Sequence, residues 1–192
     1  SGHIAFWNLA ERRKLGVLTN ALGSPGFLRF STDGRWLVNP GGKSPTQIWS
    51  AEDRTLVAEL SDSAFTERAV FSADGRWLAT VGGGDPTVRL WKTSGWRKTR
   101  TFRGHTDPIT AVDFSPDGHF LATGARNGEV KLWSLDEPPT APEHVSFPMS
   151  TDFELAADGS GFGRILKAGS SNGVASWTAE VWTTTPLQRT FA

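Results

Sequence analysis

A tryptophan recurs every 42 residues along this 192-residue chain, and this period constrains the fold more than any other feature. The four tryptophans are Trp7, Trp49, Trp91 and Trp133. A fixed period of this length indicates a repeat protein, in which each unit is a small supersecondary structure that stacks on its neighbours. The 3.6-residue apolar spacing of paired helices is not found in the units, so we expect strands instead.

A second signal, a Ser-x-Asp-Gly segment, recurs in phase with the tryptophans. It occupies residues 31–34, 72–75 and 115–118, and a shortened Ala-Asp-Gly form follows at 157–159. Asp can bond its own backbone and Gly takes positive φ, so each segment is expected to form a tight turn between strands. In the clearest unit, strands are predicted at 109–114, 120–125 and 130–133. The Asn-Gly pair at 127–128 is a strong hairpin signal between the last two.

The unit from Gly104 to Trp133 resembles a WD repeat of the β-propeller superfamily. The matching residues are Gly104-His105, the turn at 115–118 and the segment Val130–Trp133, while Ser134 stands where the family name expects Asp. The resemblance implies an all-β propeller of four-stranded antiparallel blades, each with an inner, two middle and an outer strand. A period in the low forties with four strands per unit is itself typical of propellers.

The repeat spacing divides the chain into about four and a half blades. A partial blade is expected at 1–20, full blades at about 21–62, 63–104 and 105–147, and a degenerate blade at 148–192. This is fewer than a closed ring needs, and an open propeller exposes strand edges and apolar surface. We therefore expect an incomplete ring, either a fragment of a larger propeller or a ring closed by another chain.

The two ends of the chain carry the least regular units. At the amino end a third strand is predicted near Ile4–Trp7 and an outer strand near Lys14–Thr19. At the carboxyl end Trp182 matches the third-strand tryptophan, 49 residues after Trp133. The excess over 42 residues is expected to form a longer loop around Ser170–Trp177.

The resemblance also implies a buried hydrogen-bonded chain of His, Ser or Thr, Asp and Trp within each repeat. Two units supply candidates: His105, Thr123, Asn127 and Trp133 in one, and Thr80, Asp85 and Trp91 in the unit before it. Asn127 in place of Asp removes a charge and weakens the expected link to His105. Asp62 stands where the earlier unit should have its His. A His near an acid also fits catalysis, but a set that recurs with the repeat favours a structural role.

Partners of such propellers are expected to bind loops around the central channel, on the top face. The resemblance places seven candidate residues there: Phe65, Glu67, Pro108, Thr110, Arg126, Met149 and Thr151. Gly84 and Arg126 stand at the second turns of successive repeats. Phe, Arg and Met are side chains that commonly anchor protein interfaces. The alternative interpretation is that these are ordinary loop residues.

Composition excludes several other functions. Lys plus Arg equal Asp plus Glu at 20 each, so no net field favours nucleic acid or an anionic membrane, and no apolar run reaches the length of a membrane helix. The chain has no Cys, and its four His lack metal-ligand spacing. The sequence therefore nominates no catalytic residue, metal site or cofactor. Basic runs at 12–14 and 97–103 are expected to protect edge strands, with phosphate binding as the alternative.

These observations predict a non-catalytic protein-interaction scaffold or ligand-sensing region of a larger signalling or regulatory protein in the cytoplasm. The Phe-Ser-Pro-Asp-Gly segment at residues 114–118 and the absence of Cys resemble bacterial members of the family. The expected partner is protein: the rest of the same polypeptide, another copy, or a separate effector. One alternative is a hydrolase-type propeller enzyme, for which Glu67 and Asp113 are candidate channel carboxylates. The other alternative is a purely structural assembly module.

Overall fold

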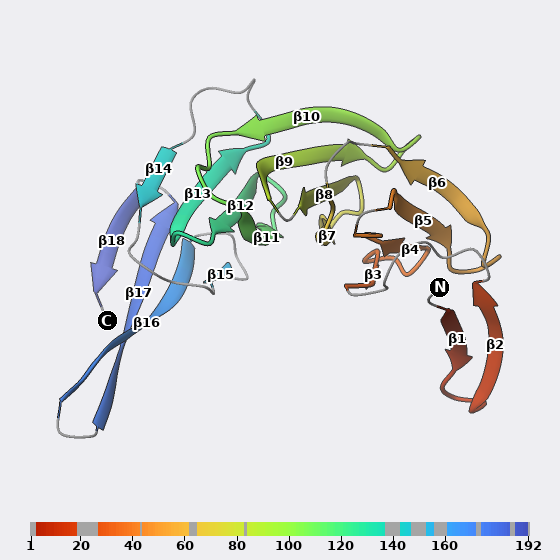
Figure 1. Cartoon of the computed structure of the whole chain (residues 1–192), viewed down its shortest axis with the longest axis horizontal. Helices are drawn as coiled ribbons and strands as arrows, with labels where there is room; N and C mark the ends of the chain where they lie inside the picture. The colour runs from red at the N-terminus through yellow and green to blue at the C-terminus, as the bar shows by residue number, and fades with distance from the viewer. Residues whose placement is uncertain are drawn as a thin grey trace.

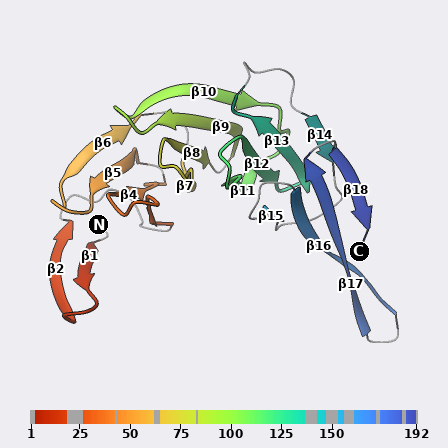
Figure 2. The same cartoon turned by 180° about the vertical axis from the view of Figure 1, so that it is seen from behind.

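In the computed structural model the strands of this chain form a series of antiparallel sheets in chain order, and every regular element described is a strand. The described residues are 3–18, 27–42, 44–61, 65–82 and 84–136, with the backbone of the strands at 143–146, 153–155, 161–171, 174–184 and 187–191. The sheets stand side by side along an open arc that does not close into a ring (Figures 1 and 2). Within the described residues no helix could cross a membrane.

The amino-terminal sheet has only two strands, and each later sheet has four. The first sheet pairs β1 (Ile4–Asn8) with β2 (Arg13–Leu18). The second contains β3 (Arg29–Phe30), β4 (Trp36–Asn39), β5 (Thr46–Ser50) and β6 (Leu56–Leu60). The third contains β7 (Arg68–Phe71), β8 (Trp77–Gly82), β9 (Asp85–Lys92) and β10 (Arg97–Arg103).

The two carboxyl-terminal sheets continue the same order. The fourth contains β11 (Ile109–Phe114), β12 (Phe120–Ala125), β13 (Glu129–Ser134) and β14 (Glu143–Ser146). The fifth contains β15 (Phe153–Leu155), β16 (Gly161–Ser171), β17 (Val174–Thr184) and β18 (Leu187–Phe191). In each four-stranded sheet the first strand lies on the concave side of the arc and the last on its convex side (Figure 1). The fold is therefore an all-β propeller arrangement of four-stranded antiparallel sheets.

The extra residues of the last sheet lengthen a hairpin, and the loop expected at 170–177 is wrong. Strands β16 and β17 pair from Gly161 opposite Thr183 as far as Ser171 opposite Val174. Extra residues shared between two adjacent strands extend the ladder and keep their backbone groups paired, whereas a long loop leaves those groups to water. Trp182 lies on β17, between Phe162 of β16 and Arg189 of β18.

Three Ser-x-Asp-Gly turns have one repeated geometry, seen first at residues 31–36. Ser31 Oγ donates to Asp33 Oδ1 at 2.6 Å, and the same carboxyl oxygen accepts the Arg35 backbone N–H at 3.0 Å. Gly34 takes φ +72°. The hydrogen bonds to its carboxylate, from Ser31 first, lower the pKa of Asp33 to about 2. Residues 72–77 and 115–120 repeat these contacts.

The second and third sheets are also joined through their backbones. Gly42 and Thr66 form an isolated antiparallel bridge, with N–H to carbonyl distances of 3.2 Å in both directions. Beside it, the backbone of Phe65 approaches Gly82 so closely that a Cβ at position 82 would lie 1.7 Å from the Phe65 carbonyl oxygen. Glycine is therefore required at 82 by space, at the point where the chain enters β7.

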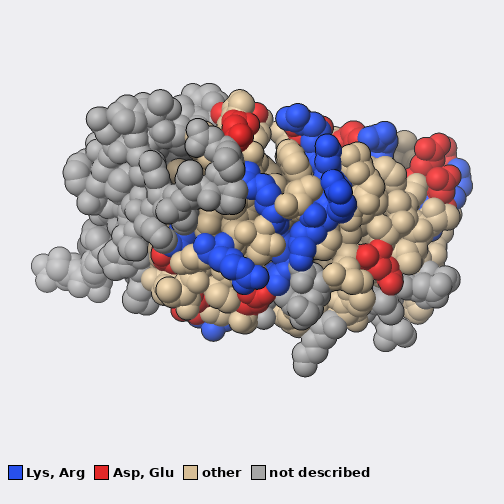
Figure 3. All heavy atoms as spheres, turned by 90° about the horizontal axis from the view of Figure 1, so that it is seen from above, with Lys and Arg blue, Asp and Glu red and all other residues tan. Residues whose placement is uncertain are grey.

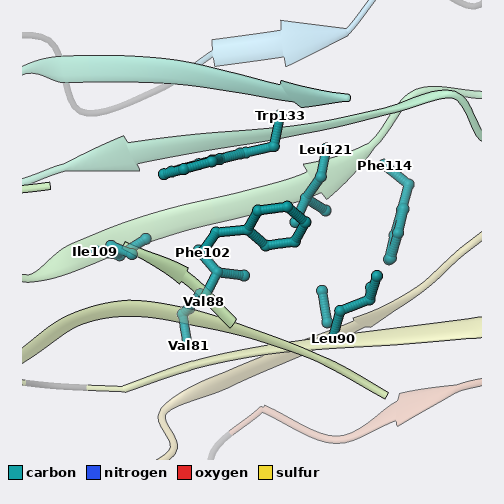
Figure 4. Packing of buried hydrophobic residues seen from close by; sticks show 9 residues of the cluster. Val81, Val88, Leu90, Phe102, Ile109, Phe114, Leu121 and Trp133 are labelled. Carbon is teal, nitrogen blue, oxygen red and sulfur yellow. The ribbon is translucent and has the colours of Figure 1, made fainter. Parts of the chain in front are cut away.

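The hydrophobic core is divided into clusters that lie between neighbouring sheets. Between the third and fourth sheets, Trp133 packs with Phe102 at a ring-centroid distance of 5.1 Å, among side chains from both sheets (Figure 4). The cluster comprises Ala79, Val81, Val88, Leu90, Phe102, Ile109, Phe114, Leu121 and Trp133. Trp91 and Trp49 belong to equivalent clusters one and two sheets earlier. Trp49, Trp91 and Trp133 thus each cover the sheet that precedes them in the chain.

Candidate functional site

A buried polar network crosses the fourth sheet next to Trp133. His105 Nε2 lies 2.6 Å from Thr123 Oγ1, which also accepts the Trp133 indole N–H at 2.8 Å. On the other side of the imidazole, His105 Nδ1 lies 2.9 Å from Glu129 Oε2. Lys131 Nζ lies 2.7 Å from Glu129 Oε1, and the Lys131 side chain has no exposed surface. The network therefore joins a hydroxyl, an indole, an imidazole, a carboxylate and an ammonium group.

Asn127 does not occupy the place predicted for it beside His105, and this corrects the sequence interpretation. Its Nδ2 donates to Thr106 Oγ1 at 3.1 Å, and its Oδ1 accepts the backbone N–H of Glu129 at 3.0 Å. Asn127 is exposed, because it lies in the turn before β13. Glu129, the first residue of β13, points its carboxylate at His105 instead.

The earlier sheets carry reduced forms of this network. Trp91 Nε1 donates to Thr80 Oγ1 at 3.0 Å, while Asp85 accepts a hydrogen bond from the Arg89 guanidinium group at 2.5 Å. Asp62, the residue in the place of the histidine, lies outside the described residues. In the second sheet Trp49 Nε1 is buried without an acceptor. The polar network is thus most extensive in the fourth sheet.

Burial and charge set the protonation of the network in the fourth sheet. Burial lowers the pKa of His105 below 6.5, against the opposing effect of the Glu129 carboxylate. Burial alone would raise the pKa of Glu129. Hydrogen bonds from Lys131 and His105, together with the charges of these two residues, outweigh burial, so the pKa of Glu129 is lowered. The favoured state is a neutral imidazole beside an ionised carboxylate. The side chains of His105 and Lys131 have no exposed surface, and Glu129 has little. This burial favours a structural role for the network.

We expect acid to destabilise the protein through His105 and Glu129. The pKa of His105 is lower in the folded chain than in the unfolded chain, so as pH falls below 6.5 the unfolded chain binds this proton first. The pKa of Glu129 is also lowered by folding, so the same difference arises below about pH 4.5. Both groups therefore lower the free energy of unfolding as pH falls. Exposed His119 acts in the opposite direction, because its hydrogen bond to Asp136 raises its pKa.

Urea unfolding at pH 7.5, 6.0 and 5.0 tests this expectation. The variant His105→Gln keeps hydrogen-bonding capacity at the buried site but cannot titrate, and it leaves His119 in place. Its unfolding free energy should fall less between pH 7.5 and 5.0 than that of the unsubstituted chain. Equal slopes in the two proteins would exclude His105 as the source of the acid sensitivity.

The described candidates for the top face lie on loops and strand starts of the third and fourth sheets. Arg126 and Glu67 are exposed, whereas Phe65, Pro108 and Thr110 are half-buried. The Arg126 N–H donates to the Pro108 carbonyl at 2.9 Å, which brings these two candidates together. The inner strands β7 and β11 are in contact, so the two candidate groups occupy neighbouring sheets. Met149 and Thr151 lie outside the described residues.

Of the two candidate channel carboxylates, Glu67 directly precedes β7 and Asp113 lies on β11. Glu67 donates its backbone N–H to the Val81 carbonyl at 3.0 Å, and Asp113 Oδ1 accepts the backbone N–H of Phe114 at 2.9 Å. Desolvation raises the pKa of Asp113, against the charge of Arg29. Among the described residues no group of three His, Asp or Glu side chains could hold a metal ion. The described part of the molecule thus offers no observation that favours hydrolase chemistry.

Sequence reasoning missed an exposed apolar surface at the amino-terminal end of the arc. Trp7 is 58% exposed, although Trp49, Trp91 and Trp133 at the equivalent repeat positions are only 4–5% exposed. Phe30 is 56% exposed, and its equivalents are Phe71 and Phe114 at 7% and 6%. The repeat spacing shows which positions are equivalent, but only the arrangement of the sheets shows that Trp7 and Phe30 are more exposed than their equivalents.

Trp7 and Phe30 lack neighbours that bury their equivalents: further strands in the first sheet and, for Trp7, a described sheet before it. In the second, third and fourth sheets the third strand pairs with a second strand that places a leucine opposite the tryptophan, as at Leu78 and Trp91. Strand β1 pairs with β2 alone, so its other edge is unpaired within the sheet. Phe30 contacts Phe6 of β1 edge-to-face at 6.2 Å. The strands that would cover Trp7 and Phe30 in a complete arrangement are not among those described.

Comparisons with known proteins identify the repeats. The family model described as WD domain, G-beta repeat matches residues 54–92 and 96–134. The chain is 31% identical over 114 residues to Protein groucho of Drosophila melanogaster, which is 58% of this chain and 16% of that protein. It is 37% identical over 94 residues to Guanine nucleotide-binding protein subunit beta of Zea mays, which is 45% of this chain and 24% of that protein.

A solved structure shows the same fold. The β-propeller domain of Cps50 (Swd1) from Myceliophteria thermophila superposes with a TM-score of 0.73 at 19% sequence identity, over 89% of this chain and 56% of that domain. This chain therefore spans about half of that solved propeller, and at most a quarter of the two relatives above. The matched repeats, the relatives and the sheet arrangement agree: the chain contains two WD repeats, at residues 54–92 and 96–134, within a β-propeller fold.

Proposed function

We propose that this chain is a non-catalytic protein-interaction region of a larger signalling or regulatory protein. The observation that carries the proposal is the apolar surface of Trp7 and Phe30 beside the unpaired edge of β1. The described equivalents of Trp7 and Phe30 are buried: Trp49, Trp91 and Trp133, and Phe71 and Phe114. Exposed large apolar side chains next to a free strand edge are typical of a protein interface.

The proposed occupant of this surface is protein from the rest of the same polypeptide. Two further strands beside β1 would complete the first sheet in the pattern of the other four. Native mass spectrometry of the intact gene product tests this: one polypeptide well above 20.8 kDa, with Trp7 shielded from acrylamide quenching, supports it. A multiple of 20.8 kDa would instead assign the surface to a second copy. A monomer of 20.8 kDa with Trp7 quenched freely would contradict both assignments.

The biological setting is a finer part of the same proposal. The absence of Cys and the Phe-Ser-Pro-Asp-Gly segment support a bacterial, cytoplasmic protein with a sensing role. The relatives described above come from a fly and a plant, so they support the WD-repeat assignment but not this setting. The fused or partner effector would carry any enzymatic activity.

We expect the double substitution Phe65→Ala and Arg126→Ala to reduce binding of partner proteins at the top face. Truncating one interface anchor commonly costs more than 1 kcal/mol, so affinity should fall at least about tenfold. Quantitative mass spectrometry of proteins that co-purify with the intact gene product measures the change. A control pair, Glu52→Ala and Leu56→Ala, removes exposed side chains from the outer part of the second sheet. An unchanged partner set in the Phe65 and Arg126 double variant would refute the assignment of this face.

A further inference from the structure

We propose that the outer edge of β10 binds an extended acidic segment of a partner protein, which adds to the third sheet as a fifth strand. Strand β10 is the outermost strand of its sheet, so one of its edges is not paired within the sheet. Four of its seven residues, Arg97, Lys98, Arg100 and Arg103, are cationic, and none is acidic. Lys and Arg side chains gather over β10 on the convex face of the arc (Figure 3).

The cations lie on both sides of the strand. Arg97 pairs with Lys92 and Arg100 with Leu90, whereas Lys98 pairs with Trp91 and Arg103 with Thr87. Paired residues share a face of the sheet, and the register shifts between Lys98 and Arg100. Leu90 packs in the cluster toward the fourth sheet and Trp91 in the cluster toward the second. An added strand with acidic residues on both faces would therefore meet a cation on each.

Arg100 is already held in position for such a contact. Its Nη1 donates to the Leu135 carbonyl at 3.0 Å, and its guanidinium group lies 4.6 Å from the centre of the Phe102 ring. Its Nε is buried without a hydrogen-bond acceptor. A guanidinium group fixed by stacking loses little further freedom on binding a carboxylate. The centre of the basic strand thus carries a positive charge that contacts with Leu135 and Phe102 hold in place.

Protection of a free edge does not by itself explain this strand. The outer strand of the second sheet, β6, has the same free edge, exposes Leu56 and Val57, and carries Glu59 with no cation. If cations were needed to block edge pairing, β6 would need them more than β10 does. Strand β10 carries more cations than the other outer strands, four among seven residues against two among six on β2, and this concentration favours a specific acidic ligand.

The chemistry of the edge favours an acidic peptide over nucleic acid. The only aromatic residue of β10, Phe102, is buried, so the strand offers no exposed ring on which a base could stack. The whole chain has no net charge, so it lacks the long-range field that concentrates proteins on nucleic acid. A free strand edge supplies backbone groups that an extended peptide can pair, and charge complementarity supplies the specificity.

A synthetic peptide of alternating Glu and Thr is the probe, measured by fluorescence anisotropy with the intact gene product. We expect it to bind, and the matched peptide with Gln in place of Glu to bind at least tenfold more weakly. The double variant Arg97→Gln and Arg103→Gln removes two exposed cations and should weaken binding of the Glu peptide at least tenfold. The control variant Arg13→Gln and Lys14→Gln, on the outer strand β2, should leave binding unchanged.

Backbone methylation separates strand addition from simple charge attraction. A Glu peptide that is N-methylated at every residue keeps its charges but cannot donate a backbone hydrogen bond along either edge, so it should lose binding. Equal binding of the methylated peptide would overturn the proposal, as would equal effects of the β10 and β2 variants. Tighter binding of single-stranded RNA than of the Glu peptide at β10 would overturn it in favour of nucleic acid. The Trp7 surface is separate, so failure here leaves the proposed function intact.

Discussion

Replacing Glu129 by Ala is expected to lower the free energy of unfolding by about 3–5 kcal/mol. The substitution removes the carboxylate that lies 2.7 Å from the fully buried Lys131 ammonium group and 2.9 Å from His105. An ammonium group buried without its counter-charge must lose its proton or draw water into the core, and both cost stability. Urea unfolding followed by tryptophan fluorescence measures the change.

The double variant Glu129→Ala and Lys131→Met separates the cost of an unpaired charge from the cost of lost packing. Methionine fills much of the volume of lysine without charge, so the double variant should be more stable than Glu129→Ala alone. Glu59→Ala is a matched control, because Glu59 accepts a hydrogen bond from Gln47 at 3.0 Å but lies on exposed β6. If Glu129→Ala costs no more than Glu59→Ala, the Lys131 charge is not held by Glu129.

Replacing Trp133 by Ala is expected to cost about 3–5 kcal/mol, whereas the same change at Trp7 costs less than about 1 kcal/mol in the 192-residue chain. Trp133 is 5% exposed, packs on Phe102 and donates its indole N–H to Thr123. Its removal leaves a cavity between two sheets and breaks a buried hydrogen bond. Trp7 is 58% exposed, so its removal takes little apolar area out of contact.

The same pair of variants in the intact gene product gives a second comparison. If further strands of that polypeptide cover Trp7, Trp7→Ala should become several times more costly there, while the cost of Trp133→Ala should stay unchanged. Thermal and urea unfolding of both proteins provide the four measurements. An equally small cost of Trp7→Ala in both contexts would mean that the amino-terminal surface is not covered by the rest of the polypeptide.

Local signals account for the parts of the fold that could be predicted. The Ser-x-Asp-Gly turns close through contacts within six residues, and the strands at 109–114 and 120–125 follow from the alternation around one such turn. Glu129 could not be identified in this way. The resemblance to WD repeats predicted that the residue in the turn, Asn127 in place of Asp, would be the partner of His105. The burial of Lys131 by the preceding sheet, which makes Glu129 its counter-charge, is a tertiary effect.

Long-range structure also decides three other features that local sequence patterns do not determine: the β16–β17 hairpin, the exposure of Trp7 and the contrast between β10 and β6. Seven extra residues before Trp182 fit a longer loop or a longer hairpin equally well in sequence, and pairing between β16 and β17 decides the matter. Trp7 has the same sequence signal as Trp133, because local periodicity does not report whether another sheet lies on that face. The basic strand β10 was visible in the sequence. Its contrast with β6 required knowing that both are outermost strands.

The unbroken chain order of the strands has a consequence for folding. Every described sheet pairs only strands that are consecutive in the sequence, so each strand pairing closes a short loop, which favours its rapid formation. Each sheet can then condense on the one made just before it as synthesis proceeds. Stability in such a linear array is approximately a sum of unit and nearest-neighbour terms. A weakened junction should therefore open by itself and leave its neighbours folded, so that this molecule unfolds in steps.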